Sequence, residues 1–187
     1  MKQKSKLFIS IIALSIGLIS VFTVWSISEI KISYDEPQEA LLAENEDAIL
    51  IPAYVTEDKA LFYFITDSNN IGAAKINKGL FGWKSDYQVW NEPIGTISDE
   101  KFNGYQKYGD EIIFGLMENG EELTVMADDI PANKINLKGS LYDESIEMEL
   151  ENVYLWYFES DNLSQINELS LINQNTNEEL DTHLYEN

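Results

Sequence analysis

An uncharged apolar run near the start of the chain is the strongest constraint on its architecture. Residues 7–28 read LFISIIALSIGLISVFTVWSIS, and Lys2, Lys4 and Lys6 precede them. A helix rises about 1.5 Å per residue, so roughly twenty such residues match a hydrocarbon core about 30 Å thick. Lysines on one flank only favour a cytoplasmic N-terminus. The run therefore predicts a single transmembrane anchor, with residues 1–6 as a basic cytoplasmic stub.

A cleaved secretion signal is the alternative interpretation of this run. Such signals usually have an apolar core of about 7–15 residues that ends at a small-residue cleavage site. Here the run is longer, and the small pair Ser26 and Ser28 directly follows the bulky Trp25. We therefore favour an uncleaved anchor in the cell membrane with the C-terminal domain outside the cytoplasm; cleavage would instead give a secreted protein. A lipoprotein is excluded, because lipid attachment at a signal sequence needs a cysteine and the chain has none.

Charge divides the chain at the end of this run. All 33 acidic residues lie from Glu29 onward, together with nine lysines and no arginine, which gives this part a net charge of −24. Nucleic acids are bound largely through Lys and Arg, so we expect no nucleic-acid partner. The same charge disfavours direct binding to an anionic membrane surface or polymer. Without cysteine, stability must come from a packed core, to which ten Tyr, eight Phe and four Trp can contribute.

Residues 29–47 read as a linker and a short helix. Asp35 is the expected N-cap, Pro37 suits the first turn, and Ala40 and Leu41 give the helix an apolar side. From residue 48 the apolar periodicity changes from 3.6 to 2, and β-branched and aromatic residues alternate with Asn, Asp and Gly turns. Residues 48–187 are therefore predicted to form an extracytoplasmic β domain.

Residues 60–90 predict a three-stranded meander with turns centred on residues 68–69 and 78–79. In this register the large residues of the outer strands oppose small residues of the middle strand, which is a reason for Gly72 and Ala74 to be small. The predicted pairs are Leu61–Ile76, Tyr63–Ala74, Ile65–Gly72, Ile76–Phe81 and Ala74–Trp83.

The dipeptide Asn119-Gly120 predicts a tight hairpin, because both residues tolerate the positive φ of a type I′ turn. One face of this hairpin is apolar, and the opposite face, which includes Ile113 and Met117, is mixed and expected to be half exposed or to meet a second layer. The pairs on the apolar face are Leu116–Leu123, Phe114–Val125 and Ile112–Ala127.

The rest of the chain repeats this pattern. Residues 145–150 alternate, residues 153–158 (VYLWYF) are continuously apolar and expected to be buried on both faces, and residues 169–173 form a last strand before the turn QNTNE. No helical crossover separates the strands, which argues against a parallel sheet. We predict a mainly antiparallel β domain, a sandwich or open barrel, with a seam near residues 91–109 that would divide it into two small halves.

Catalytic and metal motifs are missing. His183 is the only histidine, so the sequence offers no usual zinc site and no Ser-His-Asp triad. Residues 67–72 begin like a calcium loop, but Ile71 occupies a ligand position and Lys78 replaces the bidentate glutamate. Residues 173–178 lack an Asp and are better interpreted as a turn. We predict no catalytic residue, no metal ligand and no cofactor.

Aromatic side chains are the remaining candidates for partner binding. Phe81, Trp83, Tyr87 and Trp90 could form a stacking platform, although Phe81, Trp83 and Tyr87 share a strand face, which favours core packing. Trp90 lies on the other face. The candidate partner-binding residues are therefore Trp90 first, then Trp83 and Tyr87.

The segments ALFYFITDSNNIGAAKINKGLFGWKSD, YLWYFESDN and SLINQNTNEEL resemble a group of small secreted or membrane-anchored envelope proteins of Bacillus-type Gram-positive bacteria. The most specific part is residues 79–84, GLFGWK. The resemblance implies a Gram-positive source and an extracytoplasmic location, and it implies no activity. The anchor, the β fold and the missing catalytic motifs leave two function classes open. The first, which we favour, is a non-catalytic anchored domain that binds a protein or small ligand at the cell envelope. The second is a hydrolase of envelope glycans that uses two carboxylates.

Overall fold

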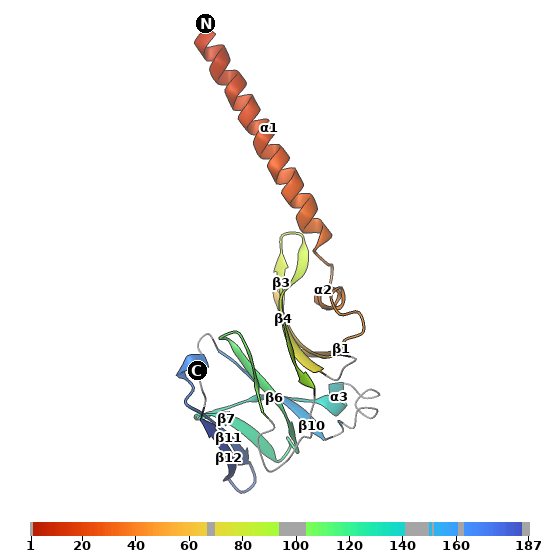
Figure 1. Ribbon diagram of the computed structural model, residues 1–187, viewed down its shortest axis with the longest axis vertical. Helices are drawn as coiled ribbons and strands as arrows, with labels where there is room; N and C mark the ends of the chain where they lie inside the picture. Colours follow the sequence, from red (N-terminus) through yellow and green to blue (C-terminus); the bar gives the residue numbers. More distant parts are fainter. Residues whose placement is uncertain are drawn as a thin grey trace.

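The computed structural model describes residues 2–66, 70–93, 104–140, 150, 152–160 and 163–184, with the backbone alone for 2–10 and 86–93. It confirms a mainly antiparallel β protein that follows one N-terminal apolar helix (Figure 1). This helix, α1 (Lys2–Lys31), projects from the rest of the molecule. Its segment Ile11–Lys31 is long and apolar enough to cross a membrane, and the most apolar part of this segment is not buried among the other described residues.

The strands of the described residues form three four-stranded antiparallel sheets. Sheet 1 has the order β1 (Ile49–Val55), β2 (Lys59–Ile65), β3 (Asn70–Gly79), β4 (Gly82–Pro93). Sheet 2 has the order β5 (Gln106–Tyr108), β6 (Ile112–Glu118), β10 (Val153–Glu159), β9 (Asn133–Asn136). Sheet 3 has the order β12 (Glu178–Leu184), β11 (Glu168–Asn173), β7 (Leu123–Ala127), β8 (Ile130–Pro131). Residues 169–173, predicted to be the last strand, belong to β11, and a further strand, β12, follows them. Three short helices complete the described elements: α2 (Pro37–Leu42), α3 (Leu137–Ser140) and the 3₁₀ helix η1 (Leu163–Gln165).

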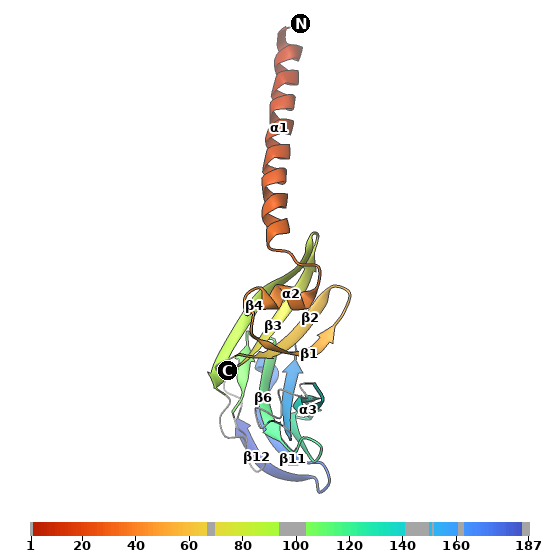
Figure 2. The ribbon, with the colours of Figure 1, turned by 90° about the vertical axis from the view of Figure 1, so that its right-hand side faces the viewer.

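Sheet 2 is the middle layer of the domain (Figure 2). One of its faces shares a core with sheet 1, in which Leu155 of β10 meets Leu61 and Tyr63 of β2. Its other face shares a second core with sheet 3, in which Trp156 of β10 meets Val125 and Leu171. Because β10 contacts a neighbour on each side, residues 153–158 are apolar at successive positions, and their predicted burial on both faces is confirmed.

Helix α2 covers the outer face of sheet 1. Its buried Leu41 packs with Phe62 and Phe64, so β2 is also buried on both faces. The N-cap is Glu36 and the prediction of Asp35 was wrong by one residue. The backbone N–H of Glu36 donates to Glu39 Oε2 at 3.4 Å, and this first-turn contact fixes where the helix begins.

The meander forms, but both predicted registers were wrong. Tyr63 pairs with Ala73, so the first hairpin is displaced by one residue. The small residues still pair with large ones, but with those on the other face of β2: Ala74 pairs with Phe62, and Gly72 pairs with Phe64. The second turn closes where Gly79 pairs with Gly82, and Gly82 has a φ of +136° that other residues rarely adopt. The Leu80 and Phe81 pair thus forms the turn, in place of residues 78–79.

The predicted hairpin at Asn119 was also wrong, because β6 and β7 belong to different sheets. Both edges of β6 are already paired, with β5 and with β10. Asn119, with a φ of 52°, accepts the N–H of Leu123 at 2.9 Å, and the turn directs the chain from sheet 2 to sheet 3. The Lys134 ammonium donates to the carbonyls of Gly120 and Leu123 at 2.6 and 3.0 Å, which holds this corner in place.

The Asn119 turn separates residues that the sequence analysis placed on one apolar face of a hairpin. Phe114 faces sheet 1, whereas Val125 packs against Ile113 and Met117 of β6. The mixed face of β6 therefore does meet a second layer, as expected. Residues 145–149 and 94–103, which include the alternating segment and most of the proposed seam, lie outside the described residues.

Candidate functional site

The aromatic residues singled out from the sequence do not form a described surface platform. Trp83 is buried, with 5% of its surface exposed, in the core beneath α2 that also contains Leu41, and Lys78 Nζ lies 5.4 Å from its ring centroid. The backbones of Tyr87 and Trp90 lie on β4, opposite Lys75 and Gly72. The side chains of Tyr87 and Trp90 lie outside the described part of the structure.

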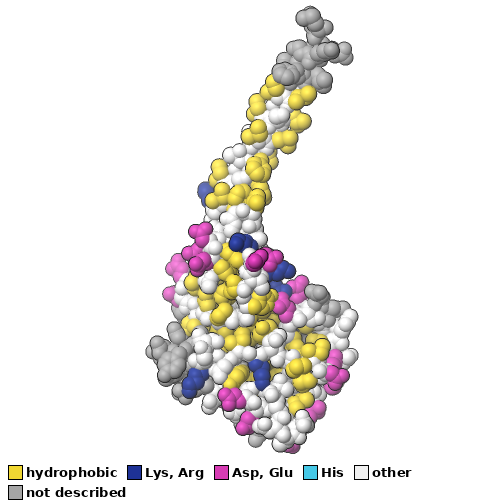
Figure 3. Space-filling view, turned by 180° about the vertical axis from the view of Figure 1, so that it is seen from behind, with side chains coloured by type: hydrophobic (Ala, Val, Ile, Leu, Met, Phe, Trp, Pro, Cys, Tyr) yellow, Lys and Arg dark blue, Asp and Glu magenta, His cyan; other side chains and the backbone are white. Residues whose placement is uncertain are grey.

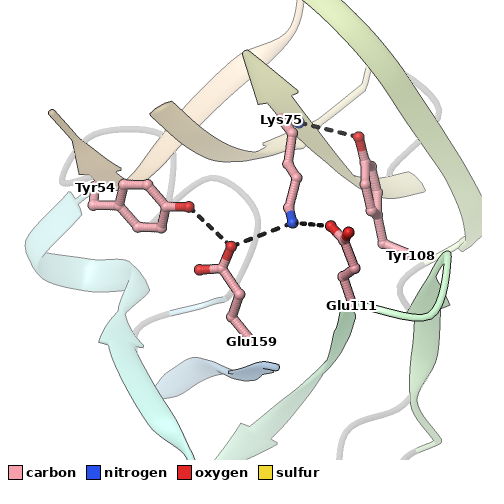
Figure 4. Close-up of polar contacts among 5 residues, drawn as sticks. All are labelled: Tyr54, Lys75, Tyr108, Glu111 and Glu159. Carbon is pink, nitrogen blue, oxygen red and sulfur yellow. Dashed lines mark hydrogen bonds and ion pairs between the residues drawn. The ribbon is translucent and has the colours of Figure 1, made fainter. Parts of the chain in front are cut away.

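Five residues from sheets 1 and 2 make a polar cluster between the two sheets (Figure 4). The Lys75 ammonium, from β3, forms ion pairs with Glu111 and, at 3.3 Å, with Glu159. The Tyr54 hydroxyl donates to Glu159 Oε1 at 3.0 Å, and the backbone N–H of Lys75 donates to the Tyr108 hydroxyl at 3.3 Å. We call these residues the Lys75 cluster.

The pKa shifts of Lys75 and Glu111 in the Lys75 cluster are those of groups that stay charged and connect sheets 1 and 2. Burial alone would lower the pKa of Lys75, but its hydrogen bonds to Glu111 and Glu159 outweigh burial and raise that pKa. The hydrogen bond from Lys75 lowers the pKa of Glu111, and burial followed by the contact with Glu159 raises the pKa of Tyr54. A lysine with a raised pKa is a poor general base, and a glutamic acid with a lowered pKa is a poor general acid. These shifts favour the charged forms of Lys75 and Glu111, as expected of an ion pair that links sheets 1 and 2.

Replacing Lys75 with methionine is expected to lower the free energy of unfolding by about 0.5–1 kcal/mol, because Glu111 and Glu159 lose their cation, and solvent screens both ion pairs: the two carboxylate side chains are 56% and 33% exposed. Urea unfolding of the full chain in detergent measures this change. Lys138→Met, at an exposed position on α3 outside the Lys75 cluster, is the control and should change stability by less than about 0.5 kcal/mol. Equal stability of both variants would contradict a role for the Lys75 cluster in holding the sheets together.

Lys75→Met should also change how the free energy of unfolding depends on pH. Because the pKa of Glu111 is lowered from its ordinary 4.5, its contribution to stability is present above pH 4.5 and is lost as the pH falls through the folded-state pKa. The Lys75 contribution is present below its ordinary 10.5 and is lost as the pH rises through its raised value. The stability difference between the natural chain and Lys75→Met should therefore be greatest between these limits and narrow outside them.

A polar hollow of about 250 Å³ lies beside the Asn119 turn. Asn136 Nδ2 donates to the Tyr154 hydroxyl at 2.8 Å, and that hydroxyl donates to Glu121 Oε1 at 3.4 Å. The backbone N–H of Asn119 donates to the carbonyl of Asn152 at 3.1 Å, which joins the turn to the residue before β10. The hollow is lined by Asn119, Glu121, Glu122, Asn136, Lys138, Asn152 and Tyr154.

The groups around this hollow can bind polar ligands by hydrogen bonds. Three amides, two carboxylates, a phenol and one ammonium supply both donors and acceptors. Burial and the nearby Glu121 raise the pKa of Tyr154, so its hydroxyl remains protonated near neutral pH. Among the described residues, no three His, Cys, Asp or Glu side chains are grouped so that they could hold a metal ion.

His183 and the Asn173 turn lie outside this hollow. His183 is half exposed on β12, and its Nε2 lies 3.4 Å from Asp181 Oδ2. Asn173 Oδ1 accepts the backbone N–H groups of Asn175 and Thr176 at 2.9 and 3.2 Å, which is a turn geometry typical of asparagine. Of the other calcium-like segment, residues 67–69 lie outside the described part of the chain.

No protein-family model, curated protein or solved structure matches this chain. The functional proposal therefore rests on the apolar helix and on the geometry of the hollow.

Proposed function

We propose that this chain is a non-catalytic, membrane-anchored protein of the cell envelope that binds a small polar ligand, or a polar segment of a protein partner, in the hollow beside Asn119. The observation that carries the proposal is the hollow itself. Its side chains converge from the Asn119 turn, β9, α3 and β10, and several are held by hydrogen bonds to one another. Groups that are already in position lose little freedom when a ligand binds.

The lining restricts the chemistry of the ligand. Glu121 and Glu122 bring two negative charges and Lys138 one positive charge, and the chain from Glu29 onward carries a net charge of −24. A neutral or cationic ligand is favoured by this field, and an anionic one is disfavoured. Hydroxyl, amide and ammonium groups match the available donors and acceptors, so neutral saccharides, amino sugars and lysine-containing peptides are the classes to test first.

Membrane anchoring with the domain outside the cytoplasm is the second part of the proposal. It is supported by the length of α1 and by the lysines that precede its apolar run on one flank only. In this arrangement the hollow lies outside the cytoplasm.

The binding proposal is tested by calorimetry on the full chain in phosphatidylcholine nanodiscs, with neutral oligosaccharides, glucosamine oligomers and a lysine-containing peptide as separate probes. We expect at least one probe to bind, and Asn152→Ala and Glu122→Gln to weaken its binding about tenfold by removing a hydrogen bond from the hollow. Glu178→Gln is the matched control, because this glutamate lies on β12 and should leave the affinity unchanged.

Two results would contradict this proposal. Unchanged affinity in both hollow variants would place the binding site elsewhere. Turnover of a glycan probe that is lost when one Asp or Glu is replaced would show a hydrolase, which is the other function class suggested by the sequence.

A further inference from the structure

The turn between β3 and β4 lies beside the end of α1 that meets the domain, and the two views of the ribbon agree on this position (Figures 1 and 2). The Phe81 ring in this turn contacts the Trp25 ring edge-on, with 5.8 Å between centroids. Trp25 in turn contacts Phe22 of the same helix at 5.5 Å. Three aromatic rings thus connect α1 with the turn.

Further contacts fix the direction of this hairpin relative to α1. One helical turn after Trp25, Glu29 forms an ion pair with Lys84 of β4. Beyond the end of the helix, Tyr34 and Trp83 exchange two backbone hydrogen bonds of 2.9 and 2.8 Å. Of these contacts, the one made by Phe81 lies closest to the middle of the apolar run. The turn of the hairpin therefore points toward the part of α1 that would enter the membrane.

The position of Trp25 sets the depth of the turn. Trp25 lies three residues before the end of the apolar run at residue 28, a distance of about 4.5 Å along the helix. If α1 spans a bilayer, Phe81 lies level with the last turn inside the apolar region. Leu80, the other residue of the turn, is 80% exposed, the largest value among the large apolar side chains of the described residues.

Lysines surround this turn although the domain as a whole is acidic. Lys31 ends α1, Lys78 precedes the turn on β3, and Lys84 follows it on β4. Figure 3 shows basic and acidic side chains gathered where the apolar helix meets the domain. Lysine side chains commonly extend along apolar surface while the ammonium stays at the level of the lipid headgroups. Apolar residues at the tip and lysines behind it match the layers of a membrane interface.

We propose that Leu80 and Phe81 are immersed in the lipid leaflet beside α1 and make a second contact with the same bilayer. The occupant of this surface is lipid, because the turn continues the apolar surface of the helix toward the hydrocarbon region. The inference rests on the membrane anchoring proposed above. The contact of Leu80 and Phe81 with lipid holds the domain close to the membrane at a fixed height.

The absence of cysteine from the chain allows a direct test. Single cysteines at Leu80, Val24 and Leu184 are labelled with an environment-sensitive fluorophore in the full chain, which is reconstituted in phosphatidylcholine vesicles. Val24 is next to Trp25 and controls for depth. Leu184, 77% exposed on β12, controls for an exposed leucine away from the helix. Quenching by lipids with a nitroxide near the headgroup is compared with quenching by aqueous iodide.

We expect the labels at residues 80 and 24 to lose emission with the nitroxide lipid and to be protected from iodide, and the label at 184 to respond only to iodide. A label at 80 that behaves like the label at 184, while the label at 24 is quenched by lipid, would overturn the immersion of the turn and leave the anchor intact. Failure of the label at 24 to respond to lipid would instead overturn the anchoring itself.

Discussion

Replacing Trp156 with alanine is expected to lower the free energy of unfolding by about 3–5 kcal/mol. The Trp156 side chain is 1% exposed in the core between sheets 2 and 3, and its ring contacts Phe158 edge-on at 6.1 Å. A Cβ atom at Gly115 would lie 2.7 Å from this ring, so the neighbouring strand is already as close as it can be. Removal of the indole therefore leaves a cavity between two sheets. Urea unfolding of the full chain in detergent measures the loss.

Leu184→Ala is the control for this prediction. The Leu184 side chain is exposed, and its truncation should change stability by less than about 0.5 kcal/mol. If Trp156→Ala cost no more than Leu184→Ala, sheets 2 and 3 would not share the core described for them.

Gly82→Ala is expected to lower stability by at least about 2 kcal/mol and to release the segment after α1. The φ of +136° is strained for any residue with a Cβ, at a cost of about 1–3 kcal/mol. The added Cβ would also lie 2.5 Å from the Tyr34 carbonyl oxygen, which accepts the N–H of Trp83. The two backbone hydrogen bonds between Tyr34 and Trp83 should therefore break. Urea unfolding measures the stability, and the rate of tryptic cleavage after Lys31 reports release of the segment.

Gly79→Ala provides a matched control within the same turn. A Cβ at Gly79 would lie 3.7 Å from the Gly82 carbonyl oxygen, which is an ordinary contact, and its φ is not positive. This variant should keep the natural rate of cleavage after Lys31. Equal cleavage rates in the Gly79 and Gly82 variants would contradict a specific role of Gly82 in attaching the segment to the hairpin.

Periodicity predicted the fold class and the β structure because these depend on burial, which is local in the sequence. The continuous apolar run at residues 153–158 indicated a strand with two covered faces, and the structure places β10 between two cores. Register and partner choice depend on other elements. Asn119 and Gly120 have the preferences of a hairpin turn, but β5 and β10 pair with β6, and Lys134 binds the carbonyls of the turn.

The candidate sites were not predicted, because their residues are brought together only by the stacking of the sheets. Lys75, Glu111 and Glu159 come from three separate strands or strand ends, and none has a distinctive neighbour in the sequence. The hollow likewise combines Asn119 with Asn136 and Tyr154, which are ordinary polar residues in their own segments. The aromatic residues that the sequence did single out include Trp83, whose face is used for packing beneath α2.

The contacts of α1 and of the segment after it with β4 fix the orientation of the helix relative to the sheets. A flexible tether would let the sheets turn independently of their anchor. Here the Glu29–Lys84 ion pair and the Tyr34–Trp83 hydrogen bonds hold the end of the helix and the following residues to one hairpin. Rotation of α1 about its own axis must therefore carry the sheets with it. The direction in which the hollow faces is therefore coupled to the rotation of α1.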